Sequence, residues 1–169
     1  SFIAAAGAAA AVLPLSGNAF GQEKIKVGFV FLGPIGDYGW TWAHNKGREA
    51  LEAALGDKVE TVYVENVAED ASAIPVIRDL AQQGCKLIFT CSYGFMEQTV
   101  QVAAEFPDVK FEHCAGYKRA DNVATYNIRF YEGRYIQGVI AAKLSKSGIV
   151  GYIGSIPIPD CASKLSASI

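Results

Sequence analysis

The sequence carries little charge and concentrates neither sign. Only 19% of its 169 residues are charged, and the formal net charge is −2. Lys and Arg form no basic block, so the composition does not favour binding to nucleic acid or to an anionic lipid surface. Because 51% of the residues are apolar, the chain has the composition of a globular protein and the length of one well-packed domain.

Cysteine is also scarce, and its spacing has no metal-binding pattern. The four cysteines lack the paired spacing of a zinc site. Cys85, Cys91 and Cys114 lie in or beside apolar, strand-like runs, where a free cysteine is usually a small core residue. The two histidines have no metal-binding partner at helical spacing. We therefore expect neither a metal site nor a cofactor.

Phosphate-binding motifs are missing as well, since the chain contains neither GxxxxGK[ST] nor GxGxxG. The nearest approach to a catalytic motif is Thr-Cys-Ser-Tyr-Gly at residues 90–94, at a strand-to-helix turn where a hydrolase places its nucleophile. Ser92 would be that nucleophile. Asp108 and His113 follow it, but they lie at the entry and exit of a single predicted strand and cannot easily meet. An α/β hydrolase is therefore kept as the alternative function.

Residues 1–21 are predicted to be a secretory signal peptide. The apolar run Ile3–Leu15 is followed by small residues around Ala19 and Gly21, just before Gln22. The run is too short to span a bilayer as a helix of the mature protein. No cysteine lies at the expected cleavage point, which argues against a lipid anchor. We expect an exported, periplasmic protein, a location that suits so few cysteines.

From residue 24 onward, β-branched and aromatic runs alternate with helical patterns. Strands are predicted at residues 24–32, 59–64, 86–91, 109–114, 122–126 and 148–153, and helices at 40–55, 70–83, 95–105 and 131–145. Their alternation at roughly 25–30 residues predicts βαβ units and an α/β fold with a doubly wound parallel sheet. We expect flavodoxin-like strand order with helices on both faces.

Each predicted helix gathers apolar residues on one face, which is expected to pack against the sheet. In the first helix this face comprises Ala43, Gly47, Ala50, Leu51, Ala54 and Leu55, and in the last Tyr135, Ile136, Val139, Ile140 and Leu144.

The loop after the first strand is the richest in potential ligand contacts. Asp37 can accept hydrogen bonds from a hydroxyl or amino group, Trp40 offers a flat stacking face, and Tyr38 lies between them. Neighbouring glycines permit a close approach of the backbone to a ligand. The alternative interpretation is that Asp37 caps the following helix and Trp40 only covers the sheet edge.

Two further strand-end loops add polar and aromatic groups. Ser92, Tyr93 and Gly94 follow the third strand and open a helix, either as a ligand contact or as an ordinary helix cap. Gly116 and Tyr117 follow the fourth strand. Because ligands of open α/β sheets bind at the carboxyl ends of the strands, these loops predict a site for a flat, weakly polar ligand.

The order of several motifs resembles that of the basic membrane protein family. The motifs are KIKVGFV at 24–30, GDYGW at 36–40, FEH at 111–113, NVATYN at 122–127, FYEGRY at 130–135 and GIVGYI at 148–153. This family consists of periplasmic solute-binding proteins of ABC importers, of the purine-nucleoside-receptor kind. The resemblance implies a type I periplasmic-binding fold, with a small molecule held between two α/β lobes.

On this resemblance, residues 22–157 form the N-terminal ligand-binding lobe, and the second lobe is missing. Residues 158–169 depart from the family pattern and are expected to be a tail arising from truncation or frameshift. The implied function is capture of a purine base or nucleoside for an ABC permease in the inner membrane, without catalysis. We expect a monomer that does not bind nucleic acid. An orphan sensory binding lobe is a further alternative.

The family's first loop carries an aspartate and a base-stacking aromatic, which correspond to Asp37 and Trp40. In nucleoside binders an asparagine commonly follows that aromatic, whereas this chain has Thr41. An acidic residue often follows the fourth strand, where this chain has His113 and Cys114. Both departures keep a free purine base open as the ligand.

Overall fold

The computed structural model describes residues 23–154 and residue 161. The predicted signal peptide and all of the predicted tail except Cys161 therefore lie outside the described residues. The described chain contains a five-stranded sheet in the order β2-β1-β3-β4-β5, with every neighbouring pair parallel. Its strands are β1 (Ile25–Val30), β2 (Val59–Val64), β3 (Leu87–Thr90), β4 (Lys110–Cys114) and β5 (Val123–Tyr126). This order confirms the predicted flavodoxin-like sheet.

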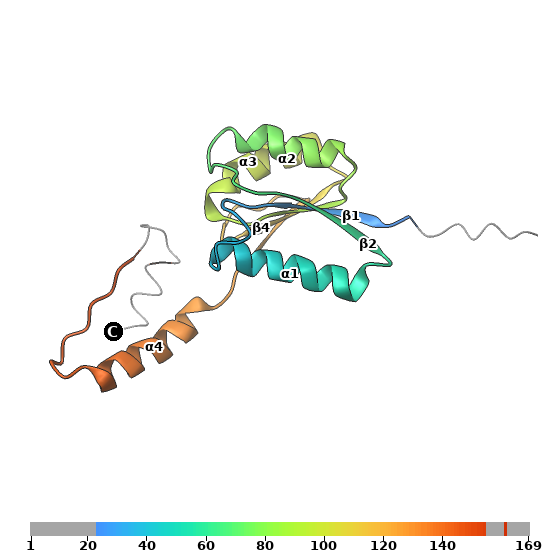
Figure 1. The fold of residues 1–169 in the computed structure, drawn as a ribbon. Helices are drawn as coiled ribbons and strands as arrows, with labels where there is room; N and C mark the ends of the chain where they lie inside the picture. Colours follow the sequence, from blue (N-terminus) through green and yellow to red (C-terminus); the bar gives the residue numbers. More distant parts are fainter. Residues whose placement is uncertain (1–22, 155–160, 162–169) are drawn as a thin grey trace, which may run out of the picture.

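Helices cover both faces of the sheet, as predicted for a doubly wound fold. The covering helices are α1 (Trp40–Leu55), α2 (Ala73–Gln82) and α3 (Met96–Glu105), with a short 3₁₀ helix η1 (Tyr93–Phe95) before α3. A fourth helix, α4 (Phe130–Leu144), follows β5. Figure 1 shows α1 on one face and α2 with α3 on the other. The larger core lies under α2 and α3. Cys85, Cys91 and Cys114 are all buried, which confirms their prediction as core residues.

The face of α1 that packs on the sheet is only partly the predicted one, because Leu51 packs against the core as predicted but most of the face does not. Ala43 and Gly47 are exposed, whereas the polar residues Thr41 and Asn45 are buried. Hydrogen bonds explain this, because Asn45 bonds both Glu49 and Arg48, at 2.8 and 2.9 Å. The Arg48 guanidinium in turn donates to Thr61 Oγ1 on β2 at 2.9 Å. A polar face can cover a sheet when its groups are satisfied in this way.

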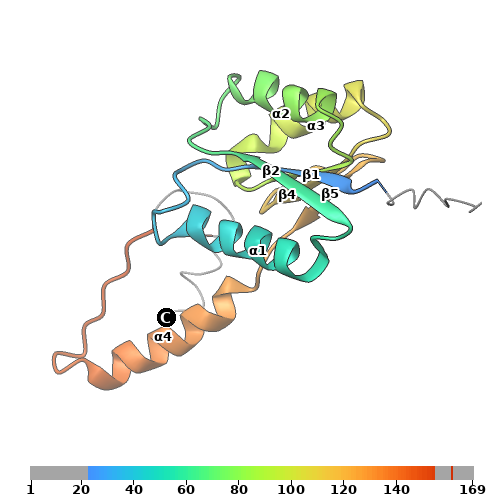
Figure 2. The same ribbon diagram turned by 45° about the vertical axis from the view of Figure 1, so that its right-hand side comes forward.

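Helix α4 also departs from its prediction. None of its residues is buried against the described part of the chain, and Tyr135 and Ile136 are 63% and 59% exposed. Figure 2 shows α4 running away from the sheet after β5. The strand predicted at 148–153 is therefore wrong for this structure: α4 carries that segment away from β5, so it has no neighbouring strand with which to pair.

Candidate functional site at the carboxyl edge of the sheet

The carboxyl ends of all five strands meet at one edge of the sheet, which lies on the left in Figure 1. Val30, Thr90 and His113 are aligned across β1, β3 and β4 near this edge. The described residues other than glycine that have positive φ are Tyr38, Asn66 and Ala115, at 53°, 60° and 63°. They lie in the loops after β1, β2 and β4. A left-handed backbone conformation costs energy for residues other than glycine and is often found at functional sites. Its occurrence in three loops of this edge makes the edge a candidate site.

Asp37 caps α1 and still faces solvent. Its Oδ1 accepts the backbone N–H of Gly39 at 2.7 Å and that of Trp42 at 3.0 Å. These two hydrogen bonds lower the pKa of the Asp37 carboxyl, which therefore stays ionised. The capping interpretation describes the geometry correctly, and the exposed carboxylate still has acceptor capacity for a second partner.

Trp40 joins the loop after β1 to the end of β3. Its indole Nε1–H donates to the carbonyl oxygen of Cys91 at 2.6 Å. The ring lies 4.9 Å from His44 and 5.9 Å from Phe130, between ring centroids. The half-buried indole is thus fixed in orientation by α1 and by the start of α4. Tyr38, by contrast, is 85% exposed and contacts only the ring of Trp42 among the described aromatic rings.

The segment Ser92–Gly94 turns from β3 into η1. Ser92 is 8% exposed and has extended backbone, and its hydroxyl forms no hydrogen bond with the described residues. The N–H of Gly94 donates to Glu69 Oε1 at 2.9 Å. A Cβ at position 94 would lie only 2.6 Å from the Cβ of Glu69, so the close approach of these two loops requires glycine.

His113 is buried beneath the loop after β4. Its Nδ1 lies 2.9 Å from Thr90 Oγ1, which is 2.9 Å from Thr99 Oγ1. Its Nε2 is buried and has no hydrogen-bond partner among the described residues. Burial lowers the pKa of His113 to about 4, so the ring is neutral at pH 7.

Gly116 packs directly over this ring, since a Cβ there would overlap His113 Cδ2 and Nε2. Tyr117 follows with 67% exposure, and its backbone N–H points to Met96 Sδ at 3.4 Å. The structure therefore assigns Gly116 a packing role that its sequence position alone did not reveal, and it leaves the Tyr117 ring open to solvent.

The loop after β2 also reaches this edge, although no ligand-contact prediction was made for it. Glu65 Oε2 accepts the N–H of Ile35 at 2.8 Å, and Glu69 holds Gly94 as described above. The signal was present in the sequence, because both glutamates follow a predicted strand at the same edge as Asp37.

The geometry of the hydrolase alternative is not assembled in the described chain. His113 Nδ1 contacts Thr90 and not Ser92. Asp108 precedes β4, whereas His113 lies near the end of β4 and Ser92 follows β3. The length of β4 therefore separates the acid from the other two residues. An acid–base–nucleophile relay needs hydrogen-bond contact between its members.

Residues 24–166 match a family model named Bmp, which describes PnrA-like ABC transporter substrate-binding proteins. The chain belongs to this family. As a Bmp-family protein it is 59% identical to a purine-binding protein of Brucella abortus over 90% of its own length. It is 34% identical over 86% of its length to a Haloferax volcanii protein named as an ABC transporter glucose-binding protein.

A solved structure agrees with this assignment. The chain matches an ABC transporter solute-binding protein of Aeropyrum pernix with a TM-score of 0.72 and 25% identity, covering 85% of this chain and 41% of that one. It spans 44% and 37% of the lengths of the Brucella and Haloferax relatives. The Bmp-family fold seen here is thus a single α/β lobe.

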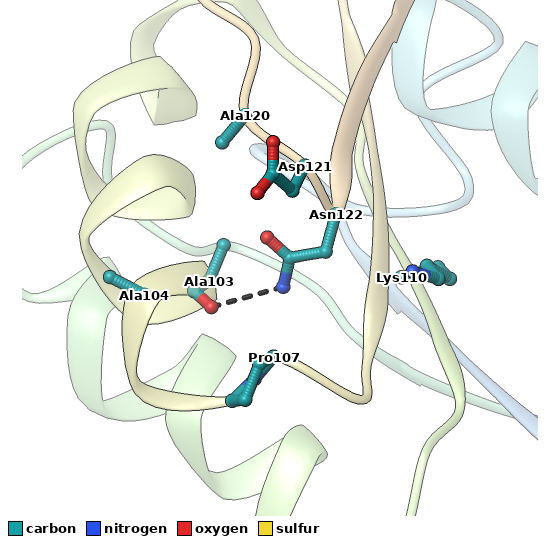
Figure 3. Close-up of a pocket in the computed structure, with 7 residues that line it drawn as sticks. All are labelled: Ala103, Ala104, Pro107, Lys110, Ala120, Asp121 and Asn122. Atoms are coloured by element: carbon teal, nitrogen blue, oxygen red, sulfur yellow. Dashed lines mark hydrogen bonds between the residues drawn. The ribbon is translucent and has the colours of Figure 1, made fainter.

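A cavity of about 380 Å³ lies at the opposite edge of the lobe, at the amino ends of β4 and β5. Figure 3 shows its lining residues, which come from the end of α3 and from the starts of these strands. Asn122 Nδ2 lies 3.0 Å from each of the carbonyl oxygens of Ala103, Phe106 and Val109. Because Asn122 is engaged in closing the end of α3, we assign it to stability.

Replacing Asn122 with alanine is expected to destabilise the lobe by about 2 kcal/mol, since carbonyl oxygens at the end of α3 lose their donor. Urea unfolding at pH 7 measures this loss. Asn127→Ala is the matched control, because the exposed Asn127 side chain bonds only the next backbone N–H, that of Ile128. Equal stability of the two variants would contradict the capping role of Asn122.

No group of three or more His, Cys, Asp or Glu side chains in residues 23–154 is arranged to hold a metal ion. Over the same range, no helix has the length and apolar character needed to cross a membrane.

Proposed function

We propose that this chain is the ligand-binding lobe of an ABC importer's substrate-binding component and that it captures a purine base or nucleoside. The observation that carries the proposal is the 59% identity with a purine-binding protein, which extends over 90% of this chain and therefore includes every loop of the carboxyl edge. The Trp40 indole would stack on the base, and Asp37 would accept its N–H or hydroxyl groups.

The charge around Asp37 and Trp40 supports a ligand without phosphate. The segments after β1, β2 and β3 (31–45, 65–72 and 91–96) contain Asp37, Glu65, Glu69 and Asp70 but neither Lys nor Arg, whereas the basic residues of the edge, Lys118, Arg119 and Arg129, follow β4 and β5. A phosphate group held beside these carboxylates would be repelled, whereas a neutral base or nucleoside meets no such penalty. Tyr38, Tyr93 and Tyr117 add aromatic surface around it.

Transport would follow from closure of this lobe and a second one over the ligand, after which the closed form docks on a permease in the inner membrane. We propose that the protein acts in the periplasm as a monomer. The relative named for glucose binding makes a sugar the second candidate ligand, at lower identity.

A binding titration tests the proposal. Adenine, guanine, adenosine and guanosine are expected to bind this chain with a Kd in the roughly millimolar range, because one lobe supplies one wall of the site. Glucose and adenosine monophosphate are expected to bind at least about tenfold more weakly. Isothermal titration calorimetry or NMR measures each Kd.

Trp40→Ala is expected to weaken purine binding about tenfold or more through loss of stacking, a change of about 1.4 kcal/mol. Trp42→Ala is the matched control, since this second tryptophan packs against Tyr38 and Lys46 on the outside of α1. Preferential binding of glucose would replace the purine proposal with the sugar, and equal effects of the two variants would remove Trp40 from the site.

A further inference from the structure

The loop between β2 and α2, residues 65–72, is bound to the loop after β1 along its first half. The Phe31 N–H donates to the Val64 carbonyl at 2.9 Å, and the Val67 N–H donates back to the Phe31 carbonyl at 3.0 Å. Asn66, in the left-handed region, donates its N–H to Gly33 at 3.4 Å. These contacts continue the β1–β2 pairing beyond the strands, so the β2–α2 loop has a fixed place beside the site (Figure 1).

Two carboxylates project from this fixed loop to different parts of the edge. Glu65 accepts the N–H of Ile35 at 2.8 Å, just before the segment that carries Asp37. Glu69 accepts the N–H of Gly94 at 2.9 Å, between Tyr93 and the start of α3. Each bond is charge-assisted, and such bonds are stronger than those between neutral groups.

Neither carboxylate belongs to the hydrophobic core. Glu65 is half-buried, Glu69 is exposed, and the Gly94 bond lies at the surface. Their removal therefore takes little from the packing that holds the lobe together. It releases instead two backbone segments that carry the proposed ligand contacts. A loop that is already in its binding conformation does not have to be ordered when the ligand arrives, which strengthens binding.

We propose that Glu65 and Glu69 are positioning residues of the ligand site: from the β2–α2 loop they hold the loops after β1 and β3 in their binding conformation without touching the ligand. This inference rests on the proposed function. It assigns a role to a loop that carries none of the aromatic or glycine signals by which the other loops are found.

The experiment measures the Kd for adenine, and the unfolding temperature without ligand, for this chain and four variants. Glu65→Ala and Glu69→Ala are each expected to raise the Kd about tenfold, the size of one lost hydrogen bond. Glu69→Gln keeps an acceptor oxygen and is expected to stay within about threefold of the wild type. Glu60→Ala, which removes an exposed carboxylate near the other end of β2, is expected to change nothing. The unfolding temperatures of all four are expected to lie within about 3 °C of the wild type.

The outcomes separate this inference from the proposed function. A wild-type chain that binds no purine would overturn the proposed function and the positioning role with it. Wild-type binding that both alanine variants retain in full would overturn only the positioning role. The positioning role would also be overturned if Glu69→Ala lost binding together with a large fall in unfolding temperature and Glu69→Gln restored neither. That pattern indicates a general structural role.

Discussion

Gly116→Ala is expected to destabilise this Bmp-family lobe by about 3 kcal/mol, the upper range for inserting a methyl group into a packed site. A Cβ at this position overlaps the imidazole of His113 and lies 3.3 Å from Met96 Sδ. His113 cannot turn aside easily, because it is 1% exposed and its Nδ1 is bonded to Thr90. Urea unfolding at pH 7.5, where His113 is neutral, measures the effect.

A double-mutant cycle identifies the ring as the cause. His113→Ala alone is expected to cost about 2–3 kcal/mol through the cavity and the lost hydrogen bond. In the double variant the new methyl group enters the space left by the ring. The loss of stability in the double variant is therefore expected to be about 2 kcal/mol smaller than the sum of the two single losses. Additive losses would contradict the proposed overlap.

Gly47→Ala is the matched control for the same chemical change. Gly47 lies within α1, and a Cβ there meets no atom within 4 Å. Alanine is favoured over glycine inside a helix, so this variant is expected to gain about 0.5–1 kcal/mol. The opposite signs at the two glycines would show that space at residue 116, and not loss of glycine as such, determines the result.

The sheet was predictable because its signals are local. β1 and β3 are short, largely apolar runs followed by turn residues, and the parallel order follows from the alternating helices. The edge on which ligands bind follows in turn from the parallel order, so the positions of Asp37 and Ser92 could be inferred without coordinates.

The contacts across that edge could not be inferred in the same way. The packing of Gly116 on His113 and the bond between Glu69 and Gly94 join residues from separate loops, and no periodicity encodes such a pairing. The buried face of α1 was predicted only in part for a related reason. Asn45 is buried because Arg48 and Glu49 satisfy it, and hydropathy alone ranks it as exposed.

The stability of the lobe is expected to fall by about 3 kcal/mol as the pH decreases from 6.5 to 4, because of His113 alone. Burial lowers its pKa from 6.5 to about 4 in the folded chain. Above pH 6.5 the ring is neutral in both states and costs nothing. Between the two pKa values the unfolded chain binds a proton that the folded chain does not, so stability falls with decreasing pH. Below pH 4 both states are protonated and the loss is complete.

His113→Asn isolates this contribution, since an asparagine amide at this position can bond Thr90 but does not titrate. Urea unfolding of both proteins at pH 7.5, 6, 5 and 4 gives the difference in stability at each pH. The substitution leaves every other titratable group in place, so the contributions of those groups cancel in the difference. We expect the variant to be less stable than the wild type at pH 7.5 and to regain about 3 kcal/mol relative to it by pH 4. A difference that stays constant with pH would show that His113 titrates alike in the folded and unfolded chain, contrary to its burial without a partner for Nε2.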